Sequence, residues 1–328
     1  TESADKILAV LPLSFDYGMN QLTQAALVGA EVVLINHLFA QDVIKACAQH
    51  RISCLAGVPP LWLQLAALEW PAAAAASLRL ITNSGGHLPR HCLQTLRQKL
   101  PHAQPYLMYG LTEAFRSTYL PPEEIDRRID SMGRAIPNAE ILVLNHEGKP
   151  CAAGEVGELV HRGVHVALGY WNDAEKTAAR YKPLPRRPQQ SGLVFDELAV
   201  WSGDLVKKDA DGYLYYVGRN DEQIKVSGYR VSPGEVEEVL YTVPGVVEAI
   251  ATGSKHPKLG EAIVVIAYVD SSYVAKTMEK QCAHKLPAWM QPALLELRHE
   301  ALPRNPNGKI DRSGLKQQFA QAFLTSDQ

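Results

Sequence analysis

The chain has 328 residues, of which 46% are hydrophobic and 21% charged, the balance of an ordinary globular protein with room for two or three domains. Thirty-three Lys and Arg against 35 Asp and Glu give a formal charge of −2, and without a basic arm or like-charge run we expect no nucleic-acid partner. No segment reaches the roughly 20 apolar residues that span a bilayer, and the first residues lack the pattern of a signal peptide. Five scattered cysteines predict reduced thiols and a cytoplasmic location rather than a disulfide framework.

The first third of the chain alternates between two hydrophobic periods. Strand-like runs occur at residues 7–11, 31–35, 54–58, 78–82 and 105–109. Helical patterns lie between them at 18–29, 41–50, 60–70 and 89–100, and the alanine run 72–76 predicts a helix or connector without a functional role. This alternation predicts β-α-β units and a largely parallel sheet.

The middle of the chain changes to short alternating segments. Strand-like patterns at 140–145, 157–162, 206–208 and 213–217 are joined by polar turns, which predicts a small antiparallel, barrel-like β unit. The proline-rich stretch 182–197 predicts an exposed, irregular excursion from this unit.

The last hundred residues predict an α+β domain. Ser232, Pro233 and Glu235 have the spacing of a helix N-cap, first helical position and capping box. Strands are expected at 247–251, 263–269 and 294–298, and helices at 274–285 and from residue 313. The fold class is therefore α/β in three parts: an α/β subdomain at 1–138, the β subdomain at 139–220 and a mobile C-terminal domain at 221–328.

One candidate site follows a predicted strand of the α/β part, in the run Tyr109-Gly110-Leu111-Thr112-Glu113. Ligands of open parallel sheets bind at the carboxyl ends of strands. Glycine allows close backbone approach, threonine offers a hydroxyl to a phosphate, and glutamate offers a hard oxygen to Mg²⁺. The alternative is a strand-to-loop turn with an exposed carboxylate.

Two further turns carry residues that could bind a nucleotide. Gly85 and Gly86 follow another predicted strand and would let a flat ring lie against bare backbone, or simply form a tight turn. Asp204, after Ser202 and Gly203, could accept hydrogen bonds from ribose hydroxyls, or cap local backbone amides.

Two polar segments in the last third have functional and structural interpretations. Arg219, Asp221 and Lys225 lie in a charged run that could grip phosphate or ribose and bend, or could be a solvated turn. Lys309, in a loop of proline, asparagine and glycine, could neutralise developing charge or lie in water.

His161 and His165 have helical spacing in a strand-like segment, which argues against a metal site.

Taken in order, these motifs resemble the adenylate-forming superfamily of acyl-CoA and aryl-CoA ligases, peptide-synthetase adenylation domains and luciferases. The resemblance rests on the runs 109–113, 157–159 with 169–172, 202–204, 218–221 with 224–225 and 228–230, and 306–309. Residues 109–119, 137–144, 163–172 and 227–236 are more narrowly similar to the acyl-CoA ligases associated with bacterial exosortase systems.

The resemblance implies roles for residues of the large domain. Thr112 would contact the α-phosphate region and Glu113 would hold Mg²⁺, both as catalytic residues. The remaining positions implied to bind the nucleotide are Gly85, Gly86 and Tyr109 around the adenine, Asp204 at the ribose hydroxyls, and Gly110.

The resemblance also implies roles for the C-terminal part. Arg219 would share the ribose with Asp204, and Asp221 would be the hinge on which the small domain turns. Lys309 would bridge carboxylate and phosphate oxygens as the main catalytic residue. Lys225 would bind a cofactor, and Gly228 would help admit a pantetheine arm.

The activity implied is that of an AMP-forming acyl-CoA ligase, which joins a carboxylic acid to coenzyme A with ATP and Mg²⁺. The Ser/Thr/Gly-rich phosphate loop of the family does not occur in the sequence, so we expect an N-terminally incomplete chain with little activity by itself. Phe15 and Asp16 are closer to the pattern of peptide-synthetase domains, which leaves amino-acid or aryl adenylation for a carrier protein as an alternative. A non-catalytic remnant is the third interpretation.

Overall fold

The computed structural model describes residues 1–184, 197–220, 222–270 and 275–324. The chain forms two compact units, Thr1–Tyr216 (unit 1) and Val217–Gln328 (unit 2). This boundary lies a few residues before the expected break at 220/221. Most of the proline-rich excursion and the hinge residue Asp221 lie outside the described residues.

Unit 1 begins with a parallel sheet in the order β2-β1-β3-β4-β5. The strands are β1 (Lys6–Ala9), β2 (Glu31–Leu34), β3 (Cys54–Gly57), β4 (Leu80–Asn83) and β5 (Gln104–Tyr109). The helices between them are α1 (Asp16–Val28), α2 (Ala40–His50), α3 (Pro59–Ala67), α4 (Ala72–Ser77) and α5 (Arg90–Lys99). The β-α-β expectation is confirmed.

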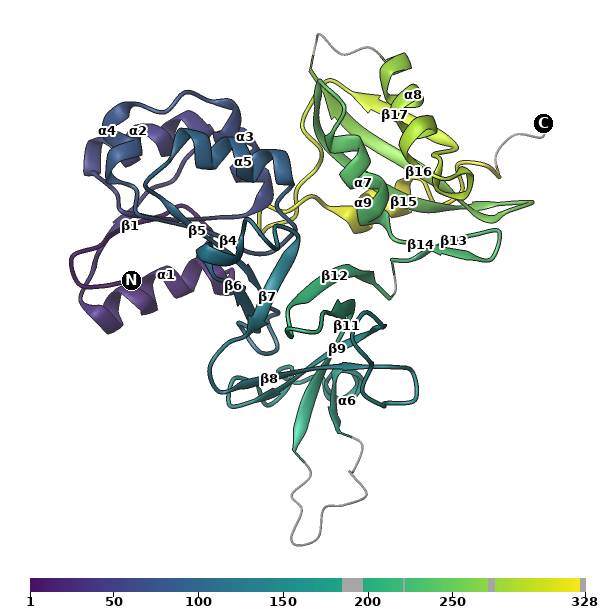
Figure 1. The fold of residues 1–328 in the computed structure, drawn as a ribbon, viewed down its shortest axis with the longest axis horizontal. Helices are drawn as coiled ribbons and strands as arrows, with labels where there is room; N and C mark the ends of the chain where they lie inside the picture. The colour runs from purple at the N-terminus through teal and green to yellow at the C-terminus, as the bar shows by residue number, and fades with distance from the viewer. Residues whose placement is uncertain (185–196, 221, 271–274, 325–328) are drawn as a thin grey trace, which may run out of the picture. The chain divides into compact units, whose positions relative to one another are not determined.

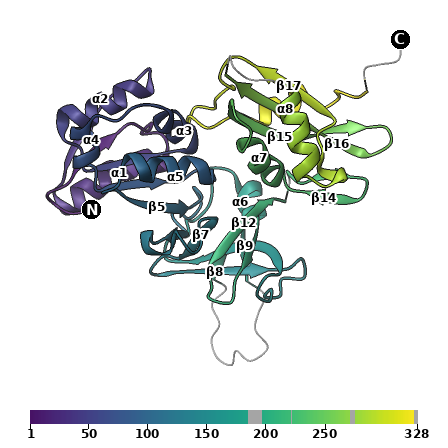
Figure 2. The same ribbon diagram turned by 45° about the horizontal axis from the view of Figure 1, so that its top comes forward.

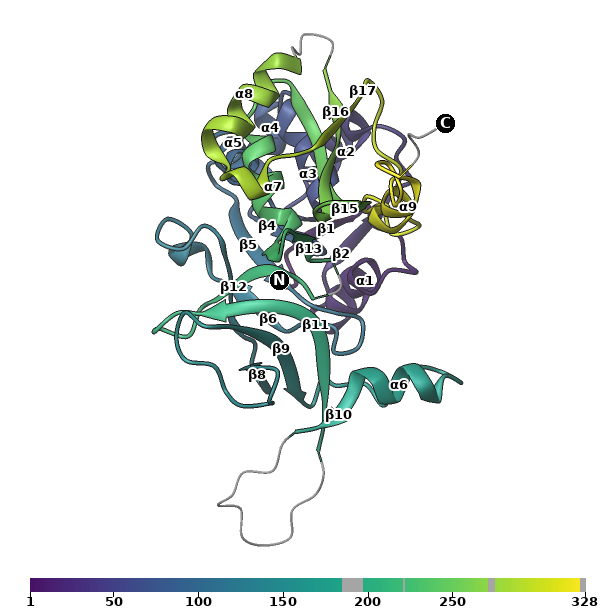
Figure 3. The same cartoon turned by 90° about the vertical axis from the view of Figure 1, so that its right-hand side faces the viewer.

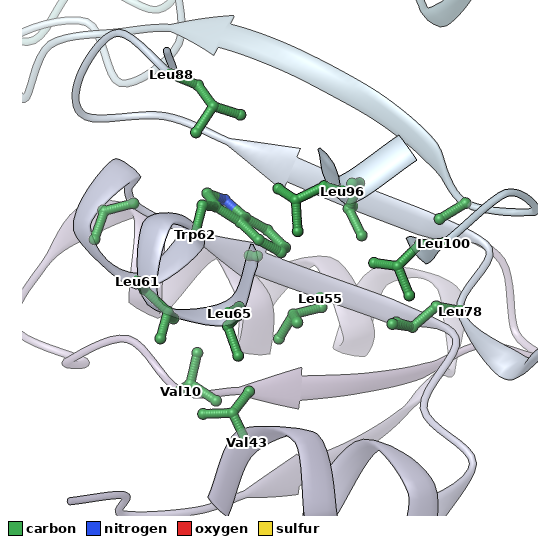
Figure 4. Close-up of a cluster of buried hydrophobic side chains, with 14 of the residues drawn as sticks. Val10, Val43, Leu55, Leu61, Trp62, Leu65, Leu78, Leu88, Leu96 and Leu100 are labelled. Atoms are coloured by element: carbon green, nitrogen blue, oxygen red, sulfur yellow. The ribbon is translucent and has the colours of Figure 1, made fainter. Parts of the chain in front are cut away.

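The two faces of this parallel sheet are covered by different helices. Figure 1 shows α1 on one side of the strands and α2–α5 on the other. Buried hydrophobic side chains form a cluster between the sheet and these helices, and Trp62 of α3, which is 1% exposed, lies within it near Leu55 and Leu96 (Figure 4). Burial of each such leucine contributes about 1.5–3 kcal/mol, so this layer anchors the strands whose carboxyl ends carry the candidate site.

Antiparallel strands extend the same sheet in the order β5-β6-β7-β12-β11-β9-β8, giving twelve strands with β10 paired to β11. They are β6 (Thr118–Leu120), β7 (Ser131–Ala135), β8 (Ala139–Leu144), β9 (Val156–Gly163), β10 (Tyr181–Pro183), β11 (Leu198–Lys208) and β12 (Leu214–Arg219). Helix α6 (Ala174–Arg180) precedes β10, and a short 3-10 helix covers Pro122–Glu124. Because one continuous sheet runs through both parts, the division into 1–138 and 139–220 stays a prediction.

Unit 2 is a second, five-stranded sheet with helices on both faces. Its strands are β13 (Ile224–Val226), β14 (Tyr229–Val231), β15 (Val246–His256), β16 (Gly260–Val269) and β17 (Leu294–Arg298). Its helices are α7 (Pro233–Tyr241), α8 (Ala275–Lys285), α9 (Arg312–Gln318) and a 3-10 turn at Ala288–Met290. Figure 2 shows α7 and α8 side by side, and Figure 3 shows them on one side of β15–β17 with α9 on the other.

The start of α7 corrects one expectation. Ser232 is the N-cap and Pro233 the first helical residue, but the Ser232 side chain makes no capping bond. Its hydroxyl instead donates to the carbonyl of Val217. The predicted capping box with Glu235 is wrong, because a tertiary acceptor takes the serine hydroxyl.

No helix among the residues described, 1–184, 197–220, 222–270 and 275–324, has the length and hydropathy to cross a membrane.

Candidate active site

The loop that follows β5 folds back against the end of its own strand. The Ser117 N–H donates to the Tyr109 carbonyl at 3.0 Å, and Phe115 has a left-handed φ of 55°. A Cβ on Gly110 would lie 2.1 Å from the Phe115 carbonyl oxygen, so only glycine fits this close approach. The loop thereby leaves Thr112 exposed and Glu113 half-buried at the carboxyl edge of the parallel strands.

Tyr109 joins this loop to β11. Its hydroxyl donates to Oδ2 of Asp204, which is only 8% exposed. Burial, reinforced by the neighbouring carboxylate, raises the pKa of Tyr109 well above its usual value. The phenol therefore stays a proton donor at physiological pH and holds the carboxylate of Asp204 in one orientation.

A bulge in β11 aims Asp204 toward Tyr109. The pairing of β11 with β9 shifts register between Trp201 and Leu205, and Gly203 has a φ of 74° that glycine tolerates. Ser202 Oγ accepts the Asp204 N–H at 3.0 Å and donates to the Leu159 carbonyl at 2.7 Å. The turn at residues 202–204 is thus held in one conformation by hydrogen bonds of the Ser202 side chain.

Glu113 is held by a residue for which the sequence analysis assigned no role. The hydroxyl of Tyr170 donates to Oε1 of Glu113, and the Ala167 N–H donates to the Glu113 carbonyl at 2.8 Å. Burial and the Glu113 carboxylate raise the pKa of Tyr170. Tyr170 lay inside the motif at 169–172, but nothing in its local pattern indicated a partner 57 positions away.

The turn after β4 lies beside the end of β5, since Asn83 pairs with Leu107 in the sheet. The side-chain amide of Asn83 donates to the Gly86 carbonyl at 3.0 Å, and Gly85 has a φ of 81°. The Oδ1 atom of Asn83 is buried and has no hydrogen-bond partner in the described part of the chain. An unpaired buried acceptor is costly, and this one lies in the turn that carries Gly85 and Gly86.

The residues assigned to the C-terminal part lie in unit 2 or at its start. Arg219 ends β12, Lys225 is an exposed residue of β13, and Gly228 has a φ of 86° in the turn between β13 and β14. The Lys225 N–H donates to Oε2 of Glu261 at 2.7 Å.

Lys309 lies at the end of a closed loop. Its N–H donates to Oδ1 of Asn305 at 3.1 Å, and its carbonyl accepts the Asn305 N–H at 2.8 Å. Arg304 and Ile310 form an isolated antiparallel bridge across the base of this loop. The backbone around Lys309 is therefore fixed within unit 2, and its side chain is half-buried.

The structure thus brings together the expected residues of unit 1 in one region at the carboxyl ends of β4 and β5 and at the β11 bulge. They are Gly85, Gly86, Tyr109, Gly110, Thr112, Glu113 and Asp204. Arg219, Lys225, Gly228 and Lys309 belong to the other unit. A surface cavity of 720 Å³ lined by Gln104 and Pro105 lies at the opposite, amino end of β5, away from these side chains.

A magnesium ion fits the donors present only if its other ligands come from a substrate. Glu113 offers a half-buried carboxylate, and the described residues hold no group of three His, Cys, Asp or Glu side chains able to bind a metal. Mg²⁺ in nucleotide sites commonly takes one or two carboxylates together with phosphate oxygens and water. Glu113 matches that pattern.

The rings of His161 and His165 lie 6.5 Å apart, centre to centre. His161 lies in β9, fully buried, and its Nδ1 is 2.8 Å from the Ser117 hydroxyl. Burial lowers the pKa of His161 to about 4, so the ring is neutral at physiological pH. Its Nε2 is enclosed and has no hydrogen-bond partner among the described residues.

All five cysteines are present as thiols, and all except Cys151 are buried. Burial raises the pKa of Cys47 and Cys92 to about 12 and that of Cys54 to about 11. Burial also raises the pKa values of Cys151 and Cys282. The thiols are therefore protonated at physiological pH.

Two protein families match the chain. The AMP-binding enzyme family matches residues 1–171, and the AMP-binding enzyme C-terminal domain matches residues 235–309.

Individual relatives align along almost the whole chain. Indoleacetate–CoA ligase of Aromatoleum aromaticum is 30% identical over 96% of this chain and 60% of its own length. Tyrocidine synthase 3 of Brevibacillus parabrevis is 30% identical over 95% of this chain and 5% of its own length. The chain therefore spans 60% of the length of this CoA ligase and 5% of the length of this synthase.

Solved structures of similar proteins carry the same fold. An anthranilate CoA ligase in complex with anthranoyl-AMP matches with a TM-score of 0.84 and 25% identity, over 98% of this chain and 60% of its own. The o-succinylbenzoate CoA synthetase of Bacillus subtilis, in complex with its acyl-adenylate intermediate, matches with a TM-score of 0.79 and 27% identity, over 96% and 61%. The mixed α/β fold expected from the sequence is confirmed.

Proposed function

The chain belongs to the AMP-binding enzyme family, and from that premise we propose that it acts in an AMP-forming acyl-CoA ligase. A carboxylate displaces pyrophosphate from ATP to give an acyl-adenylate, and the thiol of coenzyme A then displaces AMP to give a thioester. One observation carries the proposal. The segment from Tyr109 to Glu113 holds an exposed Thr112 and the carboxylate of Glu113, which accepts a hydrogen bond from Tyr170. The hydroxyl of Tyr109 ties the same segment to a second carboxylate, Asp204.

The first half-reaction brings two anions together, so its barrier is chiefly electrostatic. Mg²⁺, when bound, supplies positive charge at the phosphates. Glu113 would be its protein ligand, and Tyr170 keeps the Glu113 carboxylate oriented toward the loop. Thr112 would donate its exposed hydroxyl to an α-phosphate oxygen.

The ribose and base would be held by groups already positioned in unit 1. A carboxylate can accept about four hydrogen bonds, so Asp204 can accept from a ribose hydroxyl while it keeps its bond from Tyr109. The exposed face of the Gly85-Gly86 turn would receive the adenine, and Oδ1 of Asn83 would gain the donor that it lacks. Gly110 would complete these nucleotide-binding residues, because the absence of a side chain lets its loop fold closely against Phe115.

Unit 2 would supply the groups that change between the two half-reactions. We propose that Lys309 bridges carboxylate and phosphate oxygens during adenylation and that Arg219 shares the ribose with Asp204. Lys225 and Gly228 would serve cofactor binding and the pantetheine arm, with the hinge at residue 221. The support is chemical: Lys309 is a cation on a backbone fixed by Asn305, and the glycine turn leaves space for a narrow chain.

Adenylation for a carrier protein is the second candidate, because a CoA ligase and a peptide synthetase are equally identical to this chain. Both acceptors present the same phosphopantetheine thiol. We favour CoA, and incubation of the enzyme with its acid, ATP and either CoA or a holo-carrier protein separates the two by which thioester forms. A cytoplasmic location is part of the proposal, since both ATP and CoA are found there and the five thiols are unpaired.

The proposal is tested by ATP–pyrophosphate exchange in the full-length protein that carries this chain, with a panel of carboxylic acids. Glu113→Gln keeps an acceptor for Tyr170 but removes the charge, and we expect a loss of exchange of about 100-fold. Glu123→Gln, at an exposed carboxylate outside the site, is the matched control and should leave exchange unchanged. Absence of exchange with every acid, or equal behaviour of both variants, would contradict the proposal.

The role of Lys309 is tested by separating the half-reactions. We expect Lys309→Ala to impair acyl-adenylate formation at least about 100-fold and to spare thioester formation from supplied acyl-adenylate. Equal losses in both steps would refute the assignment.

A further inference from the structure

Arg116 is a buried guanidinium at the carboxyl edge of the parallel sheet. It lies in the same loop as Thr112, and its Cα is 3.1 Å from the position that a Cβ on Gly110 would take. The side chain is 8% exposed, although arginine is almost never buried without a partner.

The contacts of Arg116 tie three loops together at this edge. Its Nη1 donates to Oγ of Ser84, in the turn after β4, at 2.7 Å. Its guanidinium lies 5.1 Å from the ring centre of Tyr17, in the first turn of α1, and 5.2 Å from that of Phe115. The Tyr17 hydroxyl is in turn 2.5 Å from Oγ1 of Thr82. The guanidinium is therefore aimed across the ends of β1 and β4.

These contacts leave most of the guanidinium donors unused. Arginine has five N–H donors, and Ser84 takes one of them. Nε and Nη2 have no hydrogen-bond partner among the residues described. The unused donors belong to the same loop as Thr112, at the carboxyl edge of the parallel sheet.

No carboxylate in the described chain forms an ion pair with Arg116. Asp16 is near enough to raise the pKa of Arg116, but burial has the larger effect and lowers it. Oδ1 of Asp16 instead accepts the Tyr17 N–H at 2.7 Å. Arginine stays charged at physiological pH even when buried, so its charge lacks an anionic partner.

The energetic balance of this arrangement calls for an anion. The free-energy cost of desolvating an ion in a protein is larger than the stabilisation that two cation–π contacts return. A planar guanidinium with a free edge matches a carboxylate, which it can bind with two parallel hydrogen bonds.

We propose that Arg116 binds a second carboxylate of the acid substrate, so that the natural substrate is a dicarboxylic acid activated at its other end. This rests on the proposed function, because it takes the activated carboxylate to lie beside Thr112. Ser84 and the ring of Tyr17 position the guanidinium, and Arg116 acts as a specificity-determining residue.

The test compares dicarboxylic acids, aliphatic and aromatic, with their own monoamides in ATP–pyrophosphate exchange by the full-length protein. Each pair differs only in one charge, so a contact between charged groups should favour the dicarboxylate in kcat/KM by about 10-fold or more. This comparison uses the unaltered protein and is decisive even where a variant fails to fold. If kcat/KM for exchange is the same with a dicarboxylate and with its monoamide, the inference is overturned. The proposed function then still stands, because exchange with an acid has been observed.

Variants of Arg116 identify the residue responsible for the preference. We expect Arg116→Met to abolish it while exchange with monocarboxylates remains, and Arg116→Lys to retain part of it. Arg97→Met, which removes an arginine paired with Asp126 at the far end of α5, should leave the preference unchanged. If folded Arg116→Met keeps the wild-type preference for dicarboxylates, the guanidinium is structural and the assignment is refuted. If the unaltered protein shows no exchange with any acid, both this inference and the proposed function are contradicted.

Discussion

The hydrogen bond between Tyr109 and Asp204 gives a quantitative prediction. Tyr109→Phe removes only the hydroxyl and keeps the ring, while Asp204 remains a carboxylate with 8% exposure. A hydrogen bond to a charged group contributes about 1.5–3 kcal/mol, and a buried carboxylate cannot replace a lost donor with water. We therefore expect the free energy of unfolding of unit 1 to fall by about 2 kcal/mol, and AMP to bind more weakly because Asp204 loses its fixed orientation.

The interaction itself is isolated by a double-mutant cycle. Urea unfolding of wild type, Tyr109→Phe, Asp204→Ala and the double variant should give a coupling energy of about 1.5–3 kcal/mol. Tyr119→Phe is the control, since its hydroxyl has no hydrogen-bond partner in the described chain. A coupling energy below about 0.5 kcal/mol would refute the reasoning.

Titration adds a pH signature to this prediction. The pKa of Tyr109 is raised in the folded state, so its contribution to stability is fully present below the unfolded pKa near 10 and is lost only at higher pH. The difference between wild type and Tyr109→Phe should accordingly be constant from pH 6 to 9. A difference that disappears within that range would show that another group is responsible.

Three further predictions concern other parts of unit 1. Burial raises the pKa of Asp5, but hydrogen bonds, chiefly from Arg79, outweigh it and lower the pKa from 3.8 to about 2. Asp5→Asn should therefore lower the free energy of unfolding by about 2 kcal/mol at pH 7 and flatten its decrease between pH 4 and 2 in urea titrations. An unchanged pH profile would contradict this. The pKa of His161 is lowered in the folded state, so the unfolded chain takes up the proton first as the pH falls. The free energy of unfolding of the wild type should therefore decrease by about 3 kcal/mol between pH 6.5 and 4, and His161→Phe should lack that decrease in the same titration. A decrease of equal size in both proteins would show that His161 is not its cause. Gly110→Ala places a methyl group 2.1 Å from the Phe115 carbonyl oxygen, so the loop must shift. Calorimetry should then show AMP binding at least about 10-fold weaker than in the wild type. Wild-type affinity would mean that the loop is not part of the site.

Hydrophobic periodicity was sufficient to predict the β-α-β half of unit 1 and part of unit 2. The residues 294–298 predicted as a strand are those of β17, and the alanine run is the helix α4. The same periodicity missed β13 and β14, which the sequence suggested to be a polar hinge. Strands of three residues are too short to show a period, and these two exist because they pair with each other and with β16.

Side-chain partners in the candidate site were much harder to predict than its motifs. The run from Tyr109 to Glu113 and the turn at Asp204 were identified from sequence, but the bond that joins them spans 95 positions. Tyr170 and Arg116 lie within recognised motifs and look like ordinary surface residues there. Their importance follows from burial and from partners far apart in the chain, which only the folded sheet brings together. The narrower likeness to exosortase-associated ligases stays a prediction.

The protonated state of the five cysteines has a consequence for chemical selectivity. An acyl-adenylate is a potent acylating agent, and thiolates are the protein groups that capture it fastest. Because burial keeps Cys47, Cys54 and Cys92 as thiols far into the alkaline range, the chain offers little nucleophilic sulfur of its own. In the reaction that we propose, this would suppress self-acylation at these three thiols and leave the pantetheine thiol without competition from them. The same property makes the chain a clean background for thiol-directed labels placed at chosen positions.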